Sequence, residues 1–167
     1  MPLRIGLNSE SYIRFLKEKS HTARKILTAM EFDKTSYYYF DTSAAVPHSH
    51  GCGRTKVLEK KPSVFGSILG EIPTYTFVME VNPNCNVKFT DISGKSFTPT
   101  IERIFAHEMG HGYVYLLHGP FSTSSITKHL YHKAVGYENI ISRELDKHAP
   151  ERAVTDHGDP MGRYRDF

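Results

Sequence analysis

The sequence has few cysteines, no long apolar run and almost no excess charge, and each shortage excludes a class of protein. Cys52 and Cys85 are its only cysteines. One pair is no disulfide framework, so we expect two free thiols in a reducing compartment, with a single disulfide as the alternative. The net charge of +3 is too small to indicate a nucleic-acid partner. No apolar run approaches the roughly 18 residues that cross a bilayer.

The length and the first residues set expectations for organisation and location. A chain of 167 residues is about one domain's worth, so we expect a single domain over 1–167. The start, MPLRIGLNSESY, has no charged leader followed by an apolar segment. We therefore expect synthesis in a cytoplasm and, for an exported protein, a route that needs no cleavable signal peptide.

Hydrophobic periodicity predicts strand, helix and strand at the start of the chain. The strands are 3–7 and 36–41, with a helix within 8–32 between them, and a further strand at 74–82 alternates apolar and polar residues. We expect 42–63 to be a long loop with a short ribbon at 56–58, 87–89 an edge strand and 149–167 an irregular tail. Helices are predicted at 99–117, with Thr98 as the cap before Pro99, and at 124–148, in two pieces that meet near Gly136.

The loop at 42–63 contains His48, His50 and Cys52, a spacing that metal ions can use. Histidines in a glycine-rich loop are more often exposed without a ligand, and we expect that here.

The helix at 99–117 contains the motif H-E-x-x-H at His107, Glu108 and His111. Residues four apart lie on one helix face, so the two imidazoles can bind one tetrahedral Zn²⁺. Glu108 is rotated from His107 by about 100°, which puts its carboxylate beside the ion as the general base for a metal-activated water. The alternative is a helix with surface His and Glu. Ile101 and Ile104 share the face of the motif and favour an inward-facing site.

A catalytic zinc ion needs a third protein ligand, and several later residues could supply it. They are His129, His132, Glu138, Glu144, Asp146, His148, Asp156 and His157. We choose Glu138, which lies on the second helix, although a surface glutamate remains its alternative. Asp156 and His157 come next, since the tail could fold back over the site.

Three other residues of the motif helix need an explanation. His118 lies seven residues beyond His111, too far along the helix axis to share the ion, and we expect it only to end the helix. Gly110 and Gly112 lower helix propensity. Because they lack side chains, they allow another backbone or the second ligand helix to approach closely.

Two blocks of sequence, AHEMGHGYVY and VGYENIISRELDKHAPER, resemble the NleD-like zinc metallopeptidase effectors of pathogenic bacteria. The matching residues are His107, Glu108, His111, Glu138, Asn139, Arg143, Glu144, Leu145, Pro150 and Arg152. The opening RIGLNSESYIRFLKEK resembles the first strand and helix of that family more loosely. The segment between the motifs is short, and Asp146 replaces the usual small residue after R-E-L.

The resemblance implies an α+β, zincin-like domain with a small mixed sheet, the motif helix and a following ligand helix. It also implies one catalytic Zn²⁺, delivery by secretion machinery and cleavage of a protein substrate in the cytoplasm of a target cell. Tyr137, Arg152 and Tyr164 are candidates for stabilising the transition state. Structural ion pairs are an equal expectation for Arg143 and Arg152. The alternatives are an antibacterial toxin or amidase that acts on another amide, such as cell-wall peptide, and a zinc-stabilised binding module without activity.

Overall fold

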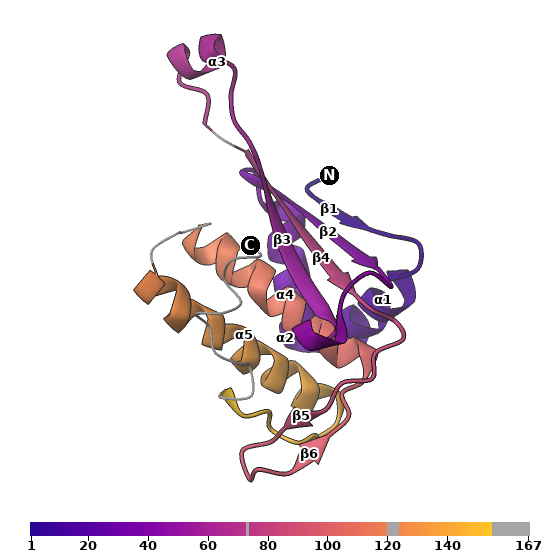
Figure 1. Ribbon diagram of the computed structural model, residues 1–167. Helices are drawn as coiled ribbons and strands as arrows, with labels where there is room; N and C mark the ends of the chain where they lie inside the picture. Colours follow the sequence, from indigo (N-terminus) through magenta and orange to yellow (C-terminus); the bar gives the residue numbers. More distant parts are fainter. Residues whose placement is uncertain (73, 120–123, 155–167) are drawn as a thin grey trace.

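A four-stranded sheet with helices packed on one face forms the centre of the computed structural model (Figure 1). The structure describes residues 1–72, 74–119 and 124–154. Its elements are β1 (Leu3–Ile5), α1 (Glu10–Lys19), α2 (His21–Phe32), β2 (Ser36–Thr42), the short 3-10 helix η1 (His48–His50), β3 (Gly53–Lys60), α3 (Val64–Ile68), β4 (Thr74–Val81), β5 (Phe89–Thr90), β6 (Ser96–Phe97), α4 (Ile101–His118) and α5 (Ser124–Leu145).

The sheet is mixed, with the strand order β1-β2-β4-β3. β1 pairs with β2 and β2 with β4 in parallel, and β3 runs antiparallel to β4 at the edge. The strand, helix and strand predicted at the start are therefore present, and the two strands pair in parallel. β5 and β6 form a separate two-stranded ribbon, so the edge strand expected at 87–89 is a shorter ribbon strand that begins at Phe89.

One face of the sheet is buried because its apolar residues fall on alternate positions. Tyr38 pairs with Phe77 and Phe40 with Met79 across β2 and β4, and all four are at most 1% exposed. The helices α1 and α2 add apolar residues to this core, namely Ile13, Leu16, Ala23, Ile26, Leu27 and Met30. On the opposite face, Glu80 forms ion pairs with Arg54 and Lys56. Within the described residues, the helices thus cover one face of the sheet.

Two predicted helices differ from the structure in their continuity. The helix expected within 8–32 is divided at Ser20, whose extended backbone and Oγ cap α2 by accepting a hydrogen bond from Ala23 N. By contrast, α5 continues through Gly136, so the predicted break there is wrong. A glycine costs a helix only about 1 kcal/mol, and the buried neighbours Ala134 and Val135 hold this part of α5 in place.

The long loop expected at 42–63 is also wrong in part, because β3 occupies 53–60 and the expected ribbon at 56–58 is its middle. We call the segment that runs from the end of β3 through α3 to the start of β4 the arm. The arm extends away from the rest of the molecule and carries α3 at its far end (Figure 1). Its tip exposes five large apolar side chains, which are Val64, Phe65, Ile68, Leu69 and Ile72.

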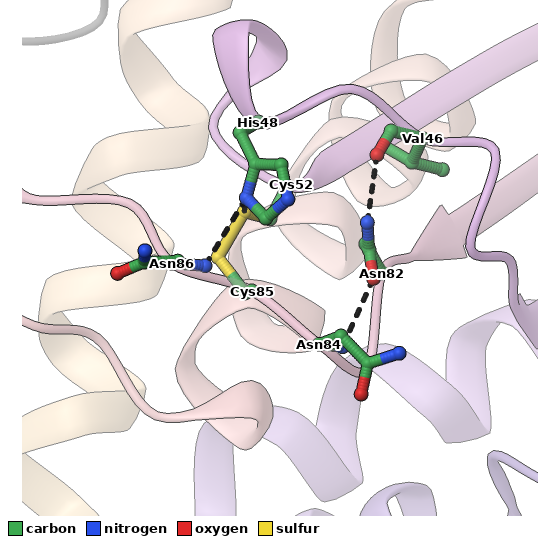
Figure 2. The surroundings of a disulfide bond; sticks show 7 residues. All are labelled: Val46, His48, Cys52, Asn82, Asn84, Cys85 and Asn86. Atoms are coloured by element: carbon green, nitrogen blue, oxygen red, sulfur yellow. Dashed lines mark hydrogen bonds between the residues drawn. A yellow bond between two sulfur atoms is a disulfide. The ribbon is translucent and has the colours of Figure 1, made fainter.

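A disulfide bond joins Cys52 and Cys85, so the expectation of free thiols is wrong (Figure 2). Cys52 directly precedes β3 and Cys85 follows β4, and the antiparallel pairing of these strands brings the two residues together. Two cysteines 33 residues apart contain no local signal of this pairing. His48 lies beside the bond, with Nδ1 3.6 Å from Cys52 Sγ, and accepts a hydrogen bond from Asn86 N. The sulfur needed for a metal site at His48 and Cys52 is therefore used in the disulfide.

The described part of the chain is a small mixed α/β domain with five α-helices. None of these helices is both long and apolar enough to span a membrane. The β3 edge of the sheet and the helices α4 and α5 bring together the polar residues considered next.

Candidate metal centre

The helix α4 holds the whole H-E-x-x-H motif in the interior of the protein. It begins after Thr100, whose side chain accepts a hydrogen bond from Arg103 N, so the cap lies two residues later than the predicted Thr98. His107, Glu108 and His111 are only 4–6% exposed. The helix ends at His118, as expected. A buried position for three polar side chains requires partners for each of them.

The two histidines of the motif face each other through the same ring nitrogen. Nε2 of His107 lies 3.0 Å from Nε2 of His111, and the two rings are almost perpendicular, at 89°. Each of His107, Glu108 and His111 offers one atom that could bind a metal ion, and these three atoms all lie within 4.8 Å of one another. Two such nitrogens and a nearby carboxylate could all be satisfied by one shared metal ion.

Burial keeps both imidazoles neutral, which is the form that binds metal ions. It lowers the pKa of His107 well below its ordinary value, and the neighbouring His111, Arg152 and Arg103 also disfavour its protonated form. Burial likewise lowers the pKa of His111 to about 3, with Arg152 contributing in the same direction. At neutral pH each ring therefore has one nitrogen that carries a lone pair instead of a proton.

Glu108 lies between α4 and the edge strand β3. Thr55 on β3 donates a hydrogen bond of 2.6 Å from Oγ1 to Glu108 Oε2. Gly53 leaves room for the carboxylate, because a Cβ atom there would lie 2.2 Å from Glu108 Oε1. Burial raises the pKa of Glu108 to about 7, although Thr55 and Arg152 act to lower it. Near neutral pH this carboxylate can therefore both accept and release a proton.

Glu138, the predicted third ligand, lies on α5 beside His107 and is completely buried. Its Oε2 is 3.0 Å from Nδ1 of His107, whereas the nitrogen of His107 that faces His111 is Nε2. Glu138 also forms ion pairs with Arg103 at 2.7 Å and Arg152 at 2.9 Å. The second helix thus reaches the motif, as expected, but on the far edge of the His107 ring.

The other candidates lie elsewhere or outside the described residues. Glu144 lies near the end of α5, and its carboxylate reaches the start of α2, where it accepts hydrogen bonds from Ser20 and Thr22. Asp146 Oδ1 accepts a hydrogen bond from His148 N in the turn after α5. The residues Asp156, His157 and Tyr164, and the side chain of His129, lie outside what the structure describes.

The two described candidates for transition-state stabilisation have structural contacts. Tyr137 packs edge-to-face against Tyr113 of α4, with 5.2 Å between ring centroids. Arg152 is 4% exposed, and its guanidinium lies 3.5 Å from the ring centroid of Phe89 besides contacting Glu138. The ion pair expected for Arg152 is present. Arg143 forms its own ion pair with Glu151, on the exposed side of α5.

The sequence pattern missed three residues that shape the site, Gly53, Thr55 and Arg103, and it gave no role to Asn139. Arg103 had a usable signal, because it precedes His107 by four residues and so lies on the same helix face. Gly53 and Thr55 had none, since they belong to the segment predicted as a loop.

Gly110 allows the close approach of α5 that its position predicted, whereas Gly112 makes room for side chains and not for another backbone. A Cβ atom at Gly110 would lie 3.0 Å from Cα and O of Ala134 on α5. One at Gly112 would lie 2.8 Å from the side-chain ends of Met30 and Met79. Gly110 therefore sets the approach of α5, and Gly112 faces α2 and the sheet.

The chain has no significant match among protein-family models, curated proteins or solved structures.

Proposed function

We propose that the protein is a zinc metallopeptidase that cleaves a peptide bond in a protein substrate. The observation that carries the proposal is the pair of Nε2 atoms 3.0 Å apart in two buried histidines, with a carboxylate oxygen of Glu108 within 4.8 Å of the ligand atoms of both. Zinc prefers imidazole nitrogen with tetrahedral geometry, which favours it over calcium or magnesium for this donor set. His107 and His111 would hold the ion. Glu138, Asp156 and His157 remain predictions for the third position.

The chemistry requires a nucleophilic water, a base and a proton donor for the leaving amine. Zinc, when bound, supplies a Lewis acid that lowers the pKa of a bound water to about 7. Glu108 would take up a proton as attack begins and release it to the leaving amine. The Thr55 hydroxyl holds Oε2 of Glu108, and we assign the proton transfer to Oε1.

The NleD-like resemblance extends the proposal to a zincin-like effector that acts in the cytoplasm of a target cell. The α4 helix with the motif, followed by α5 with Glu138, agrees with that resemblance in element order. Delivery through a dedicated secretion system belongs to the same proposal.

The decisive experiment compares the parent with Glu108→Gln. Purified protein would be analysed for metal and then incubated with a host-cell lysate, and new N-terminal peptides would be mapped. We expect one zinc ion per chain in both proteins, and cleavage about 10²- to 10⁴-fold slower in the variant. Equal cleavage by both would overturn the general-base role. Absence of zinc in the parent would overturn the metal centre.

The same experiment separates the alternative activities. Zinc binding without new peptides from the lysate, but with release of amines from purified cell-wall peptide, would identify an amidase. Zinc held by four protein ligands, measured by X-ray absorption, would identify a structural metal and a binding module.

A further inference from the structure

Glu138 is surrounded by charged and polar groups that leave its carboxylate no freedom of orientation. It is 0% exposed, and each oxygen has a cationic partner. Arg103 Nε donates to Oε1 at 2.7 Å, and Arg152 Nη1 donates to Oε2 at 2.9 Å. Hydrogen bonds between charged groups are short and strongly directional, so this carboxylate is fixed relative to both arginines.

Asn139, the next residue of α5, ties the two arginines to each other. Its Oδ1 accepts hydrogen bonds from Arg103 Nη2 at 3.0 Å and from the Arg152 backbone N at 2.8 Å. Its Nδ2 donates to the Arg152 backbone O at 3.0 Å. Residues from α4, α5 and the following segment thus form one buried network.

The ribbon of β5 and β6 covers this network with two aromatic rings. The Phe97 ring lies 4.5 Å from the Arg103 guanidinium, and the Phe89 ring lies 3.5 Å from that of Arg152. The two rings pack edge-to-face, with 5.9 Å between centroids. Aromatic faces attract cations and exclude water, which strengthens the ion pairs beneath them.

The network ends at His107, on the edge of the ring opposite the candidate metal. Oε2 of Glu138 contacts Nδ1, and Nε2 faces His111. A carboxylate that accepts a hydrogen bond from Nδ1–H requires the tautomer whose lone pair is on Nε2. Metal-binding histidines in general are oriented by such a bond from their second ring nitrogen.

We propose that Glu138 is a positioning residue, which fixes the orientation and tautomer of His107 through Nδ1 and is itself not a metal ligand. Arg103, Arg152 and Asn139 hold it in place. This inference rests on the proposed metal centre and replaces the ligand role predicted for Glu138. It also means that a third zinc ligand has to come from another residue.

The inference can be tested first in the metal-free parent protein. Nitrogen-15 correlation spectra of the histidine rings distinguish a proton on Nδ1 from one on Nε2. We expect the Nδ1–H tautomer for His107, with the proton shifted downfield by its hydrogen bond. A proton on Nε2 instead would overturn the proposal, whether or not the protein is an enzyme.

A second test uses zinc and the variants Glu138→Gln and Glu144→Gln. Competition with a chromophoric chelator should show zinc affinity about 10- to 100-fold weaker for Glu138→Gln and within about twofold of the parent for Glu144→Gln, the matched change on the same helix. X-ray absorption should show the same zinc ligands in Glu138→Gln as in the parent. Loss of an oxygen ligand, or unchanged affinity, would overturn the proposal.

The two proposals can fail separately. If the parent binds no zinc, the proposed function fails, while the tautomer of His107 still tests the role of Glu138. If Glu138→Gln does not fold, the tautomer in the parent decides alone.

Discussion

Thr55 and Glu108, 53 residues apart in the chain, are joined by a hydrogen bond of 2.6 Å in the interior of the protein. Thr55 is 2% exposed, and its strand position faces the helices, opposite Met79. The edge strand therefore contributes directly to the placement of the proposed general base. Among the described residues, Thr55 is the one whose side chain forms a hydrogen bond with Glu108.

Thr55→Val should slow peptide cleavage while leaving zinc binding intact. Valine keeps the shape of the side chain but removes the donor, and a buried hydrogen bond to a charged group is worth about 1.5–3 kcal/mol, or roughly 10- to 150-fold in rate. Thr55→Ser is the matched control and should stay within about threefold of the parent. The measurement is kcat/KM with the lysate substrate. Equal rates for the valine and serine variants would show that the hydroxyl has no role.

Gly110→Ala and Gly136→Ala should change stability in opposite directions. A Cβ atom at Gly110 would press on the α5 backbone at Ala134, and such overpacking costs about 1–3 kcal/mol. At Gly136 a Cβ atom meets nothing within 4 Å, so alanine should stabilise α5 by about 0.5–1 kcal/mol. Urea unfolding of both variants measures the difference. A stable Gly110→Ala protein would mean that α5 can move away from α4 at little cost.

Removing the disulfide should lower the free energy of unfolding by about 2–4 kcal/mol, because the bond closes a long loop in the unfolded chain. The variant is Cys52→Ala with Cys85→Ala, and the measurement is its urea midpoint. As a control, the parent with reductant should unfold at the same concentration as the variant, and reductant should leave the variant unchanged. A parent that is equally stable with and without reductant would contradict the pairing.

The stability of the protein should fall in acid partly through Glu144. Burial raises the pKa of Glu144, but hydrogen bonds from Ser20 and Thr22 outweigh it and lower the pKa below its ordinary value of 4.5. The unfolded chain then binds the proton more readily, so this stabilisation is complete above the unfolded pKa and is lost as the pH falls through the lower folded value.

Glu144→Gln should therefore be less stable than the parent at pH 7, by about 0.3–1 kcal/mol for such an exposed group. The difference should shrink as the pH falls below about 4.5, the ordinary value. Thermal unfolding across pH measures both proteins. A difference that stays constant from pH 7 to pH 3 would show that ionised Glu144 is not the source of the stability.

Features that depend on near neighbours in the chain could be predicted from the sequence. His107 and His111 lie on one face of α4 because helical geometry alone sets their spacing. The strand β4 was evident because Phe77 and Met79 alternate with more exposed residues. In each case the deciding information lies within a few residues.

Features that depend on β3 could not be predicted. Charged residues, among them Arg54, Lys56 and Glu59, interrupt the apolar pattern of β3. The segment is a strand because it pairs with β4, which supplies its hydrogen-bond partners. Without β3 there is no reason to pair the cysteines or to bring Thr55 to Glu108. The position of Glu138 behind His107 depends on how α4 and α5 pack, which periodicity within either helix does not specify.

The disulfide has a consequence for a chain that is cut in the arm. Lys60 is exposed at the end of β3 and lies between Cys52 and Cys85. A protease that cleaves after Lys60 would divide the protein into residues 1–60 and 61–167, with Thr55 on one piece and Glu108 on the other. The sulfur–sulfur bond would still connect the pieces. Such nicked protein would migrate as one band on a denaturing gel until a reducing agent separated it into two.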